Sequence, residues 1–241
     1  MNVANHVFVV TGASMGIGLA TAEALTAKGG KVALLARSEE ALHAASARLK
    51  DSFAVVADMT DFESVRRAIG SVKAHYGRID GLVNNAGRSY AADVEHVDPD
   101  LFNEIFRLNV LGPIVAMQAA IPTMRAQGSG SIVNVNSGTA FMTIPGYGVY
   151  SASKRALLGF SQTARMELEK DGIVVGEVYP FITATNFGKN RMGAAGAGPT
   201  GNYAAGDSPE FVAGLIVQAI EEGVAQVFAN ERIRALAGAG K

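Results

Sequence analysis

The chain has 241 residues, a formal net charge of −1 and 18% charged side chains. This length suffices for one large α/β domain, and the balanced charge offers no basic surface for a nucleic acid or an anionic membrane. The absence of cysteine excludes disulfides, thiol nucleophiles and thiolate metal ligands. The four histidines are scattered, so we expect no metal site.

The amino-terminal residues carry no basic cluster, and the apolar run 7–10 stops at Thr11 and Gly12. A run of this length is too short for a signal peptide or a membrane span. We therefore expect a cytoplasmic protein with no membrane partner.

Short apolar, β-branched runs alternate with longer amphipathic stretches along most of the chain. In chain order, the predicted strands are 6–11, 31–36, 53–57, 81–84, 131–135, 173–179 and 226–229. The predicted helices are 17–28, 39–50, 61–76, 99–125, 149–170 and 208–222. Apolar strands followed by crossover helices indicate a doubly wound, Rossmann-type α/β fold, with a parallel sheet of about seven strands covered on both faces. Because no linker divides the chain, residues 1–241 are predicted to form a single domain.

Two glycine- and alanine-rich segments interrupt this alternation. Residues 187–206 contain few side chains that could anchor a core, which is typical of a floppy surface loop or of a lid. Because so long a loop in a compact domain is often functional, we predict a flexible substrate lid there. Residues 235–241 are small and are predicted to be frayed.

A glycine-rich segment at 11–18, Thr-Gly-Ala-Ser-Met-Gly-Ile-Gly, joins the first predicted strand to the first predicted helix. Glycines at such a junction allow a tight turn and let a pyrophosphate approach the main-chain N–H groups of the helix N-terminus. The spacing differs from Gly-x-Gly-x-x-Gly, and the lysine of a P-loop is missing. The placement predicts a dinucleotide site.

Tyr150 and Lys154 lie about one helical turn apart near the start of the predicted helix 149–170. A neighbouring ammonium favours the phenolate, so Tyr150 could exchange a proton at a lower pH than a free tyrosine. Ser137 follows the predicted strand 131–135, at the edge where open parallel sheets bind their ligands. The spacing Tyr-x-x-x-Lys alone also occurs by chance on solvated helices.

Five motifs, in this order, resemble the compact single-domain branch of the short-chain dehydrogenase/reductase family. They are the segment 11–18, Asn84-Asn85-Ala86-Gly87, Asn109, Ser137 and the motif from Tyr150 to Lys154. The resemblance extends from residue 7 to about residue 230. It implies a dinucleotide-binding catalytic domain that transfers hydride between a nicotinamide and a small ketone, aldehyde or secondary alcohol.

The resemblance also implies catalytic roles. Ser137 would donate a hydrogen bond to the substrate oxygen, and Tyr150 would act as the acid/base. Lys154 would lower the pKa of Tyr150 and bind the ribose on the nicotinamide side. Asn109 resembles an asparagine that holds a water between Lys154 and solvent, although a plain structural amide is an alternative.

NADP(H) is the cofactor that the resemblance favours. A carboxylate after the second strand would select NAD by binding its ribose 2′-hydroxyl, but this chain has Ala36 followed by Arg37. The Arg37 guanidinium could bind a 2′-phosphate, unless it is simply solvated. Met15 stands where relatives that prefer NADP often have a basic residue. The implied cofactor-binding residues are Gly12, Ser14, Met15, Gly16, Ile17, Gly18, Arg37, Ser38, Asp58, Met59, Asn85, Ala86, Gly87, Tyr150, Lys154, Pro180, Thr183 and Thr185.

Three positions allow more than one interpretation. Asp58 resembles the carboxylate that accepts a hydrogen bond from adenine, or it could cap the predicted helix 61–76. Phe181 replaces the glycine that follows Pro180 in the family, and either shapes the pocket or packs in the core. Arg88 could contact an anionic substrate or remain solvated.

The predicted pocket is mostly apolar and favours a medium-sized hydrophobic ketone or aldehyde. Its candidate lining residues are Thr139, Phe141, Ile144, Tyr147, Phe187 and Met192. In relatives, helices that match 99–125 and 149–170 pair across a two-fold axis, so we expect a homodimer or homotetramer. Two alternatives are a catalytically silent dinucleotide-binding regulator and a halohydrin dehalogenase-like lyase, which would have arginine at the position of Lys154.

Overall fold

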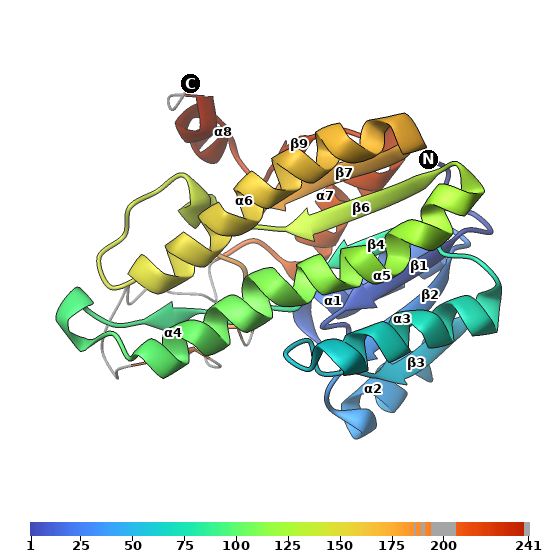
Figure 1. Ribbon diagram of the computed structural model, residues 1–241, viewed down its shortest axis with the longest axis horizontal. Helices are drawn as coiled ribbons and strands as arrows, with labels where there is room; N and C mark the ends of the chain where they lie inside the picture. Colours follow the sequence, from blue (N-terminus) through green and yellow to red (C-terminus); the bar gives the residue numbers. More distant parts are fainter. Residues whose placement is uncertain (186, 189–190, 194–205, 239–241) are drawn as a thin grey trace.

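The computed structural model describes residues 1–185, 187–188, 191–193 and 206–238. Seven parallel strands form one sheet in the order β3-β2-β1-β4-β6-β7-β9, which confirms the predicted doubly wound arrangement (Figure 1). The strands are β1 (Val7–Thr11), β2 (Lys31–Ala36), β3 (Ser52–Val56), β4 (Gly81–Asn84), β6 (Gly130–Val135), β7 (Ile173–Tyr179) and β9 (Gln226–Phe228). The chain winds outward in both directions from β1 and β4, which pair directly.

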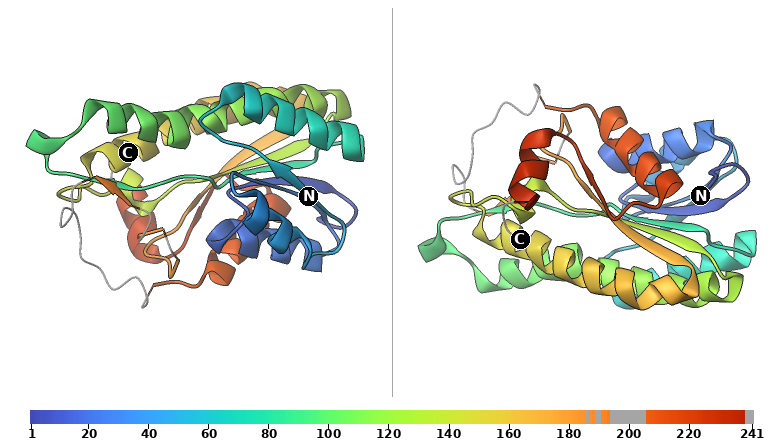
Figure 2. Two further views of the ribbon diagram at one scale, coloured as in Figure 1. Left: turned by 90° about the horizontal axis from the view of Figure 1, so that it is seen from below. Right: turned by 90° about the horizontal axis from the view of Figure 1, so that it is seen from above.

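Helices cover both faces of this sheet. Figure 2 shows α3, α5 and α6 on one face and α1, α2 and α7 on the other. Their bounds are α1 (Gly16–Ala27), α2 (Glu39–Ser46), α3 (Phe62–Tyr76), α5 (Gly112–Gln127), α6 (Gly148–Leu168) and α7 (Pro209–Glu222). This two-sided cover explains why the strands are continuous apolar runs rather than alternating ones.

The first strand shows how such a run serves two cores. All five residues of β1 are buried. Val7 and Val9 belong to the hydrophobic cluster on one face of the sheet, and Phe8 and Val10 belong to the cluster on the other. Successive side chains of a strand point to opposite faces, so one apolar run contributes to both clusters.

The predicted helix 99–125 consists of three pieces. Helix α4 (Pro99–Phe106) continues through a π-helical turn, Arg107–Leu111, into α5. Within Pro99–Gln127, an 18-residue window is long and apolar enough for a membrane span, but half of this window is buried inside the protein. A core helix accounts for this composition. Asn109 lies within the π-helical turn, a feature often found at functional sites.

The carboxyl-terminal prediction was wrong in part. Residues 235–238 were expected to be frayed, but they belong to helix α8 (Glu231–Gly238). The helix is anchored because Ile233 is fully buried against Tyr179 and Ala140, and the Ile233 N–H donates to the Asn230 side chain at 3.0 Å. A single buried isoleucine between two arginines gave little periodic signal.

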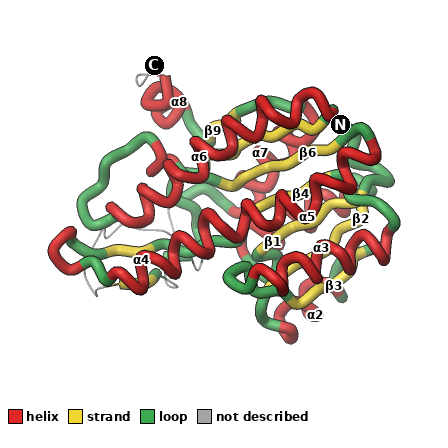
Figure 3. Tube along the Cα trace, in the orientation of Figure 1, coloured by secondary structure: helices red, strands yellow, loops and turns green. Residues whose placement is uncertain are grey.

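A second, two-stranded sheet was not predicted. Strand β5 (Tyr90–Ala91) pairs in parallel with β8 (Met192–Gly193), and it lies beside α4 and away from the main sheet (Figure 3). This pairing involves part of the predicted lid, since Met192 donates its N–H to the Ser89 carbonyl at 3.0 Å. Most of the predicted lid, 187–206, lies outside the described residues.

Candidate active site

The candidate site is a cavity of about 680 Å³ at the carboxyl edge of the sheet. Ligands of open α/β sheets bind at this edge, where the winding direction changes. Most of the predicted cofactor-binding and catalytic residues line the cavity, namely Gly12, Ser14, Met15, Gly16, Ile17, Arg37, Ser38, Met59, Asn85, Ala86, Gly87, Ser137, Tyr150, Lys154, Pro180, Thr183 and Thr185. Three predicted residues, Gly18, Asp58 and Asn109, are not among the lining residues.

The glycine segment is tied to the end of β4. The Thr11 hydroxyl accepts hydrogen bonds from the N–H groups of Asn85 and Ala86, each at 3.0 Å, and the Asn85 amide donates to the Thr11 carbonyl at 2.9 Å. A Cβ on Gly18 would lie 2.3 Å from the Gly12 carbonyl oxygen, closer than any real contact. The glycine at position 18 therefore allows the close packing of the turn against the start of α1, although Gly18 does not itself line the cavity.

Asp58 occupies a local turn outside the cavity lining. Its carboxylate accepts hydrogen bonds from the N–H and the hydroxyl of Thr60, each at 2.8 Å. Helix α3 is capped instead by Asp61, whose carboxylate accepts from the N–H groups of Glu63 and Ser64. The capping alternative for Asp58 was therefore wrong, and its contact with adenine stays a prediction.

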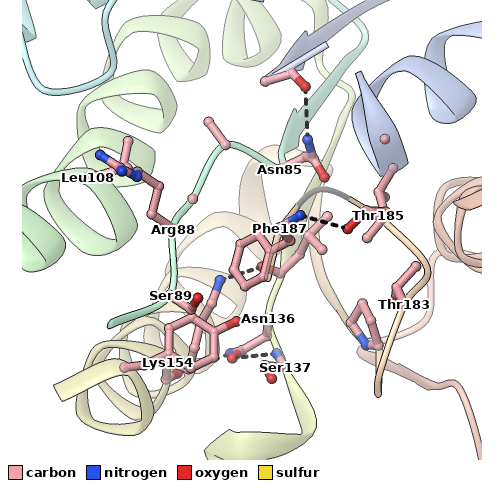
Figure 4. A pocket seen from close by; sticks show the side chains of 18 of the residues that line it. Asn85, Arg88, Ser89, Leu108, Asn136, Ser137, Lys154, Thr183, Thr185 and Phe187 are labelled. Atoms are coloured by element: carbon pink, nitrogen blue, oxygen red, sulfur yellow. Dashed lines mark hydrogen bonds between the residues drawn. The ribbon is translucent and has the colours of Figure 1, made fainter. Parts of the chain in front are cut away.

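Ser137, Tyr150 and Lys154 come together from two elements. Ser137 lies just beyond β6, and its hydroxyl oxygen accepts a hydrogen bond from the Thr139 N–H at 3.2 Å. Tyr150 and Lys154 lie in the first turns of α6, with exposed fractions of 7% and 5%, so both are shielded from bulk water. The Lys154 ammonium lies 5.8 Å from the centre of the Tyr150 ring. These three side chains line one cavity together with the glycine segment. Figure 4 labels Ser137 and Lys154 in this cavity.

The Lys154 ammonium is fixed by the main chain. Its Nζ donates to the Val135 carbonyl at 2.9 Å. Burial lowers the pKa of Lys154 to about 8, while the negative charge of Glu177 opposes this shift. At neutral pH the lysine is mostly charged and can stabilise a neighbouring phenolate.

Asn109 connects the π-helical turn to the neighbouring elements. Its amide nitrogen donates to the Arg88 carbonyl at 2.9 Å and to the Ser153 hydroxyl at 3.2 Å, and its oxygen accepts from the Arg88 N–H at 3.0 Å. The side chain thus holds the segment after Gly87 against α6. The predicted contact of Asn109 with a water stays a prediction.

Four of the six residues predicted to line the substrate pocket do line the cavity. Thr139, Ile144, Tyr147 and Phe187 line the cavity, whereas Phe141 and Met192 do not. Phe141 packs against Tyr179, with ring centres 4.9 Å apart, and Met192 packs against the cluster around Tyr90, so predicting them as lining residues was wrong.

Phe181 and Arg88 both line the cavity. Phe181 is 36% exposed, which excludes the alternative that it is packed in the core. The Arg88 guanidinium lies 3.8 Å from the Glu104 carboxylate, and Figure 4 shows the side chain directed toward Leu108. The geometry therefore favours a pocket role for Phe181 and an ion pair for Arg88.

Two polar residues of the site were missed. Asn136 follows β6 and lines the cavity, and Glu177 on β7 lies behind it; both are buried and they are hydrogen-bonded to each other at 2.7 Å. The signal in the sequence was a glutamate inside the apolar run 173–179, where a charged residue is unexpected.

The comparisons with known proteins agree with this geometry. Residues 6–194 match the short chain dehydrogenase family. The chain is 32% identical over 201 residues to dehydrogenase/reductase SDR family member 7B of Mus musculus, a match that covers 80% of this chain and 62% of that protein. It is 34% identical over 186 residues to an uncharacterized oxidoreductase of Staphylococcus saprophyticus, covering 75% of this chain and 80% of the relative.

Among solved structures, a short-chain dehydrogenase from Streptomyces avermitilis superposes with a TM-score of 0.84 at 33% identity, covering 98% of this chain and 92% of that one. The family match covers more than half of the chain and includes the glycine segment, Ser137, Tyr150 and Lys154. The protein therefore belongs to the short-chain dehydrogenase/reductase family.

Proposed function

We propose that the protein is an NADPH-dependent carbonyl reductase, which acts as an alcohol dehydrogenase in the reverse direction. The observation that carries the proposal is the shared cavity, in which Ser137, Tyr150 and Lys154 face the same space as the glycine segment. A reductase needs a proton donor, a hydrogen-bond donor for the substrate oxygen and a dinucleotide site within reach of one another.

The residues present fit a bound dinucleotide. Met15 precedes α1 without capping it by its side chain, so the first N–H groups of this helix are open to an anion such as a pyrophosphate. Gly16 has a φ of +58°, which favours glycine, and its position lets the chain pass close to Thr185. The buried Thr183 hydroxyl has no hydrogen-bond partner among the described residues and can serve a ligand amide.

Arg37 supports the choice of NADPH. It follows β2 directly, lines the cavity and is exposed, and no carboxylate occupies the preceding position, Ala36. A guanidinium can form paired, charge-assisted hydrogen bonds with a 2′-phosphate. Ser38 is the N-cap of α2, where its hydroxyl accepts from the Ala41 N–H at 3.4 Å. The first turn of α2 therefore begins beside this proposed phosphate site.

The side chains of this site can perform carbonyl reduction. When bound, the cofactor supplies the hydride that goes to the carbonyl carbon of the substrate. As negative charge develops on the carbonyl oxygen, the Ser137 hydroxyl donates a hydrogen bond to it and the Tyr150 hydroxyl transfers its proton to it. Lys154 stabilises the resulting Tyr150 phenolate through its positive charge.

The substrate pocket combines apolar walls with a few hydroxyls. Ile144, Tyr147, Phe181 and Phe187 supply the apolar lining, which favours a medium-sized hydrophobic ketone or aldehyde. The buried Ser89 hydroxyl also lines the cavity and has no partner among the described residues, so it can bind a second polar group of the substrate.

We also propose a cytoplasmic homodimer or homotetramer. Phe160 and Met166 on α6 are 39% and 79% exposed, and Leu111 at the start of α5 is 43% exposed. Exposed apolar residues on these helices suit a two-fold interface between copies of the chain. A chain without cysteine also suits a reducing compartment.

The test is a steady-state assay with a panel of ketones, aldehydes and quinones and with NADPH or NADH as reductant. Tyr150→Phe should lower kcat by about 10²- to 10⁴-fold and leave NADPH binding largely intact, because the loss is mainly that of the proton donor. Tyr76→Phe is the matched control, since this hydroxyl donates to the Asp51 carbonyl far from the cavity. Equal turnover of Tyr150→Phe and the wild type would refute the proposal, and NADPH binding without any turnover would favour a silent regulator.

Cofactor choice has its own test. Arg37→Ala should raise KM for NADPH and leave KM for NADH unchanged, because only NADPH carries the 2′-phosphate. Arg48→Ala is the control, as Arg48 pairs with Glu23 on the surface at 3.0 Å. A wild-type preference for NADH would contradict the NADPH assignment.

A further inference from the structure

A buried carboxylate lies beneath the candidate active site, and the reaction proposed above does not use it. Glu177 is 2% exposed and lies within β7. Its Oε1 accepts a hydrogen bond from the Asn136 amide at 2.7 Å, and its Oε2 accepts one from the Tyr179 hydroxyl at 2.8 Å. Gln226 on β9 donates to the Tyr179 oxygen at 3.0 Å. Each carboxylate oxygen therefore has a fixed donor.

Asn136 connects this carboxylate to the catalytic residues. Its amide nitrogen also donates to the main-chain carbonyl of Lys154 at 3.1 Å. Its oxygen accepts the N–H of Ser137 at 2.9 Å, the bond drawn between these two residues in Figure 4. One side chain thus contacts the main chain of two residues of the proposed mechanism.

The Glu177 carboxylate and the Lys154 carbonyl together determine which way the Asn136 amide points. An ionised carboxylate can only accept hydrogen bonds, and the Lys154 carbonyl can also only accept. Both must therefore face the amide nitrogen of Asn136, which leaves its oxygen for the Ser137 N–H. With the amide reversed, its oxygen would face two acceptors and the Ser137 N–H would lose its partner, at a substantial free-energy cost in a buried site.

We propose that Glu177 is a positioning residue of the active site, which holds Ser137 and Lys154 in their reactive arrangement through Asn136. The proposal rests on the function proposed above. It assigns Glu177 no contact with the substrate or the cofactor. It also explains why a carboxylate is buried in the middle of an otherwise apolar parallel strand, where charged residues are disfavoured.

The groups that act on Glu177 come from three elements. Lys154 and the neutral Ser161 lie on α6, Tyr179 lies on β7, and the neutral Asn136 follows β6. Burial raises the pKa of Glu177, and hydrogen bonds from the neutral groups and the charge of Lys154 oppose this increase. In return, the negative charge of Glu177 raises the pKa of Lys154.

Two variants distinguish the positioning role of the Glu177 side chain from the effect of its negative charge. Glu177→Ala removes one of the two acceptors of the Asn136 amide nitrogen and should lower kcat roughly ten- to a hundredfold, with KM for NADPH unchanged. Glu177→Gln keeps an acceptor oxygen for Asn136, and its own amide can donate to the Tyr179 oxygen. This variant should therefore recover most of kcat at neutral pH.

Gln226→Leu is the matched control. Gln226 pairs with Glu177 through the main chain of β9 and β7, but its side chain donates to the Tyr179 oxygen rather than to Glu177 or Asn136. The substitution removes this one hydrogen bond of the network and should keep the kcat of the wild type. Thermal unfolding of all three variants establishes that each is folded in the assay. Equal kcat of Glu177→Ala and the wild type, or no recovery in Glu177→Gln, would overturn the proposal.

The pH profile distinguishes positioning beside Lys154 from a purely structural role. Glu177→Gln removes the negative charge that raises the pKa of Lys154. The alkaline limb of kcat/KM for reduction should therefore shift to lower pH in this variant, because Lys154 loses its proton earlier. An unshifted limb would count against the proposal.

A readout without substrate separates this proposal from the proposed function. If the wild type reduces no carbonyl, the proposed function fails, but the link to Ser137 can still be measured by NMR-detected amide exchange. The Ser137 N–H should exchange faster in Glu177→Ala than in the wild type, because its acceptor on Asn136 is no longer held. Equal exchange rates would overturn the positioning role whether or not turnover is found.

Discussion

The buried carboxylate of Glu177 should make the free energy of unfolding depend measurably on pH. Burial raises its pKa from 4.5 to about 7, although hydrogen bonds and Lys154 oppose the shift. The folded protein therefore binds this proton more tightly than the unfolded chain does. Between pH 4.5 and 7 the folded state holds more protons, so the free energy of unfolding falls as the pH rises through this window.

The size of the effect follows from the two pKa values. One pKa unit corresponds to about 1.36 kcal/mol, so a rise from 4.5 to about 7 removes roughly 3 kcal/mol of stability above neutral pH. Lys154 acts in another window. Burial lowers its pKa from 10.5 to about 8, so its contribution makes the protein more stable as the pH rises between these values.

The assay is urea unfolding of the wild type and Glu177→Gln at a series of pH values from 4 to 7.5. Far-ultraviolet circular dichroism is a suitable probe because the chain has no tryptophan. The difference between the two proteins cancels the other titrating groups. We expect Glu177→Gln to gain roughly 3 kcal/mol relative to the wild type as the pH rises across the window. A difference that stays constant with pH would refute a raised pKa for Glu177.

Three further predictions concern the glycine segment, the pocket and a helix cap. Gly18→Ala should abolish NADPH binding, because the new Cβ would lie 2.3 Å from the Gly12 oxygen. Gly70→Ala is the control, since its new Cβ would meet nothing within 4 Å; it should raise the free energy of unfolding in urea by roughly 0.5–1 kcal/mol. Phe181→Gly should lower KM for bulky ketones, and an unchanged KM would count against a pocket role. Asp61→Ala should cost about 1 kcal/mol of stability, because two N–H groups of α3 lose their acceptor.

The fold was predictable because its strands are continuous apolar runs separated by helices. The bounds of β2, β4 and β7 were predicted without error, and the other four main strands deviate at their ends. Helix α2 ends at Ser46, before the predicted residue 50, because Ser52 bonds back to the Ser46 carbonyl at 2.9 Å and turns the chain early. Such a contact depends on the tertiary arrangement and leaves no periodic pattern.

The cavity residues could be predicted from local motifs. These motifs lie at the ends of strands and the starts of helices, and the fold brings these ends together at one edge of the sheet. The support beneath the cavity could not be predicted in this way. Asn134 and Glu177 are partners in the register of β6 and β7, and Asn136 reaches the carboxylate from beyond the end of β6. The hydrogen bond between Asn136 and Glu177 joins residues 41 positions apart, and only the pairing of the strands defines it.

The same carboxylate has opposite consequences for stability and for geometry. An apolar residue in place of Glu177 would relieve the burial of a charge, and the protein would gain stability above neutral pH. It would also leave the Lys154 carbonyl as the remaining acceptor of the Asn136 amide nitrogen, so the amide that bonds the Ser137 N–H and the Lys154 carbonyl would be held less firmly. Local departures from optimal stability are typical of functional sites. A buried glutamate that lowers stability while orienting two active-site residues is therefore better explained by the reaction than by the fold.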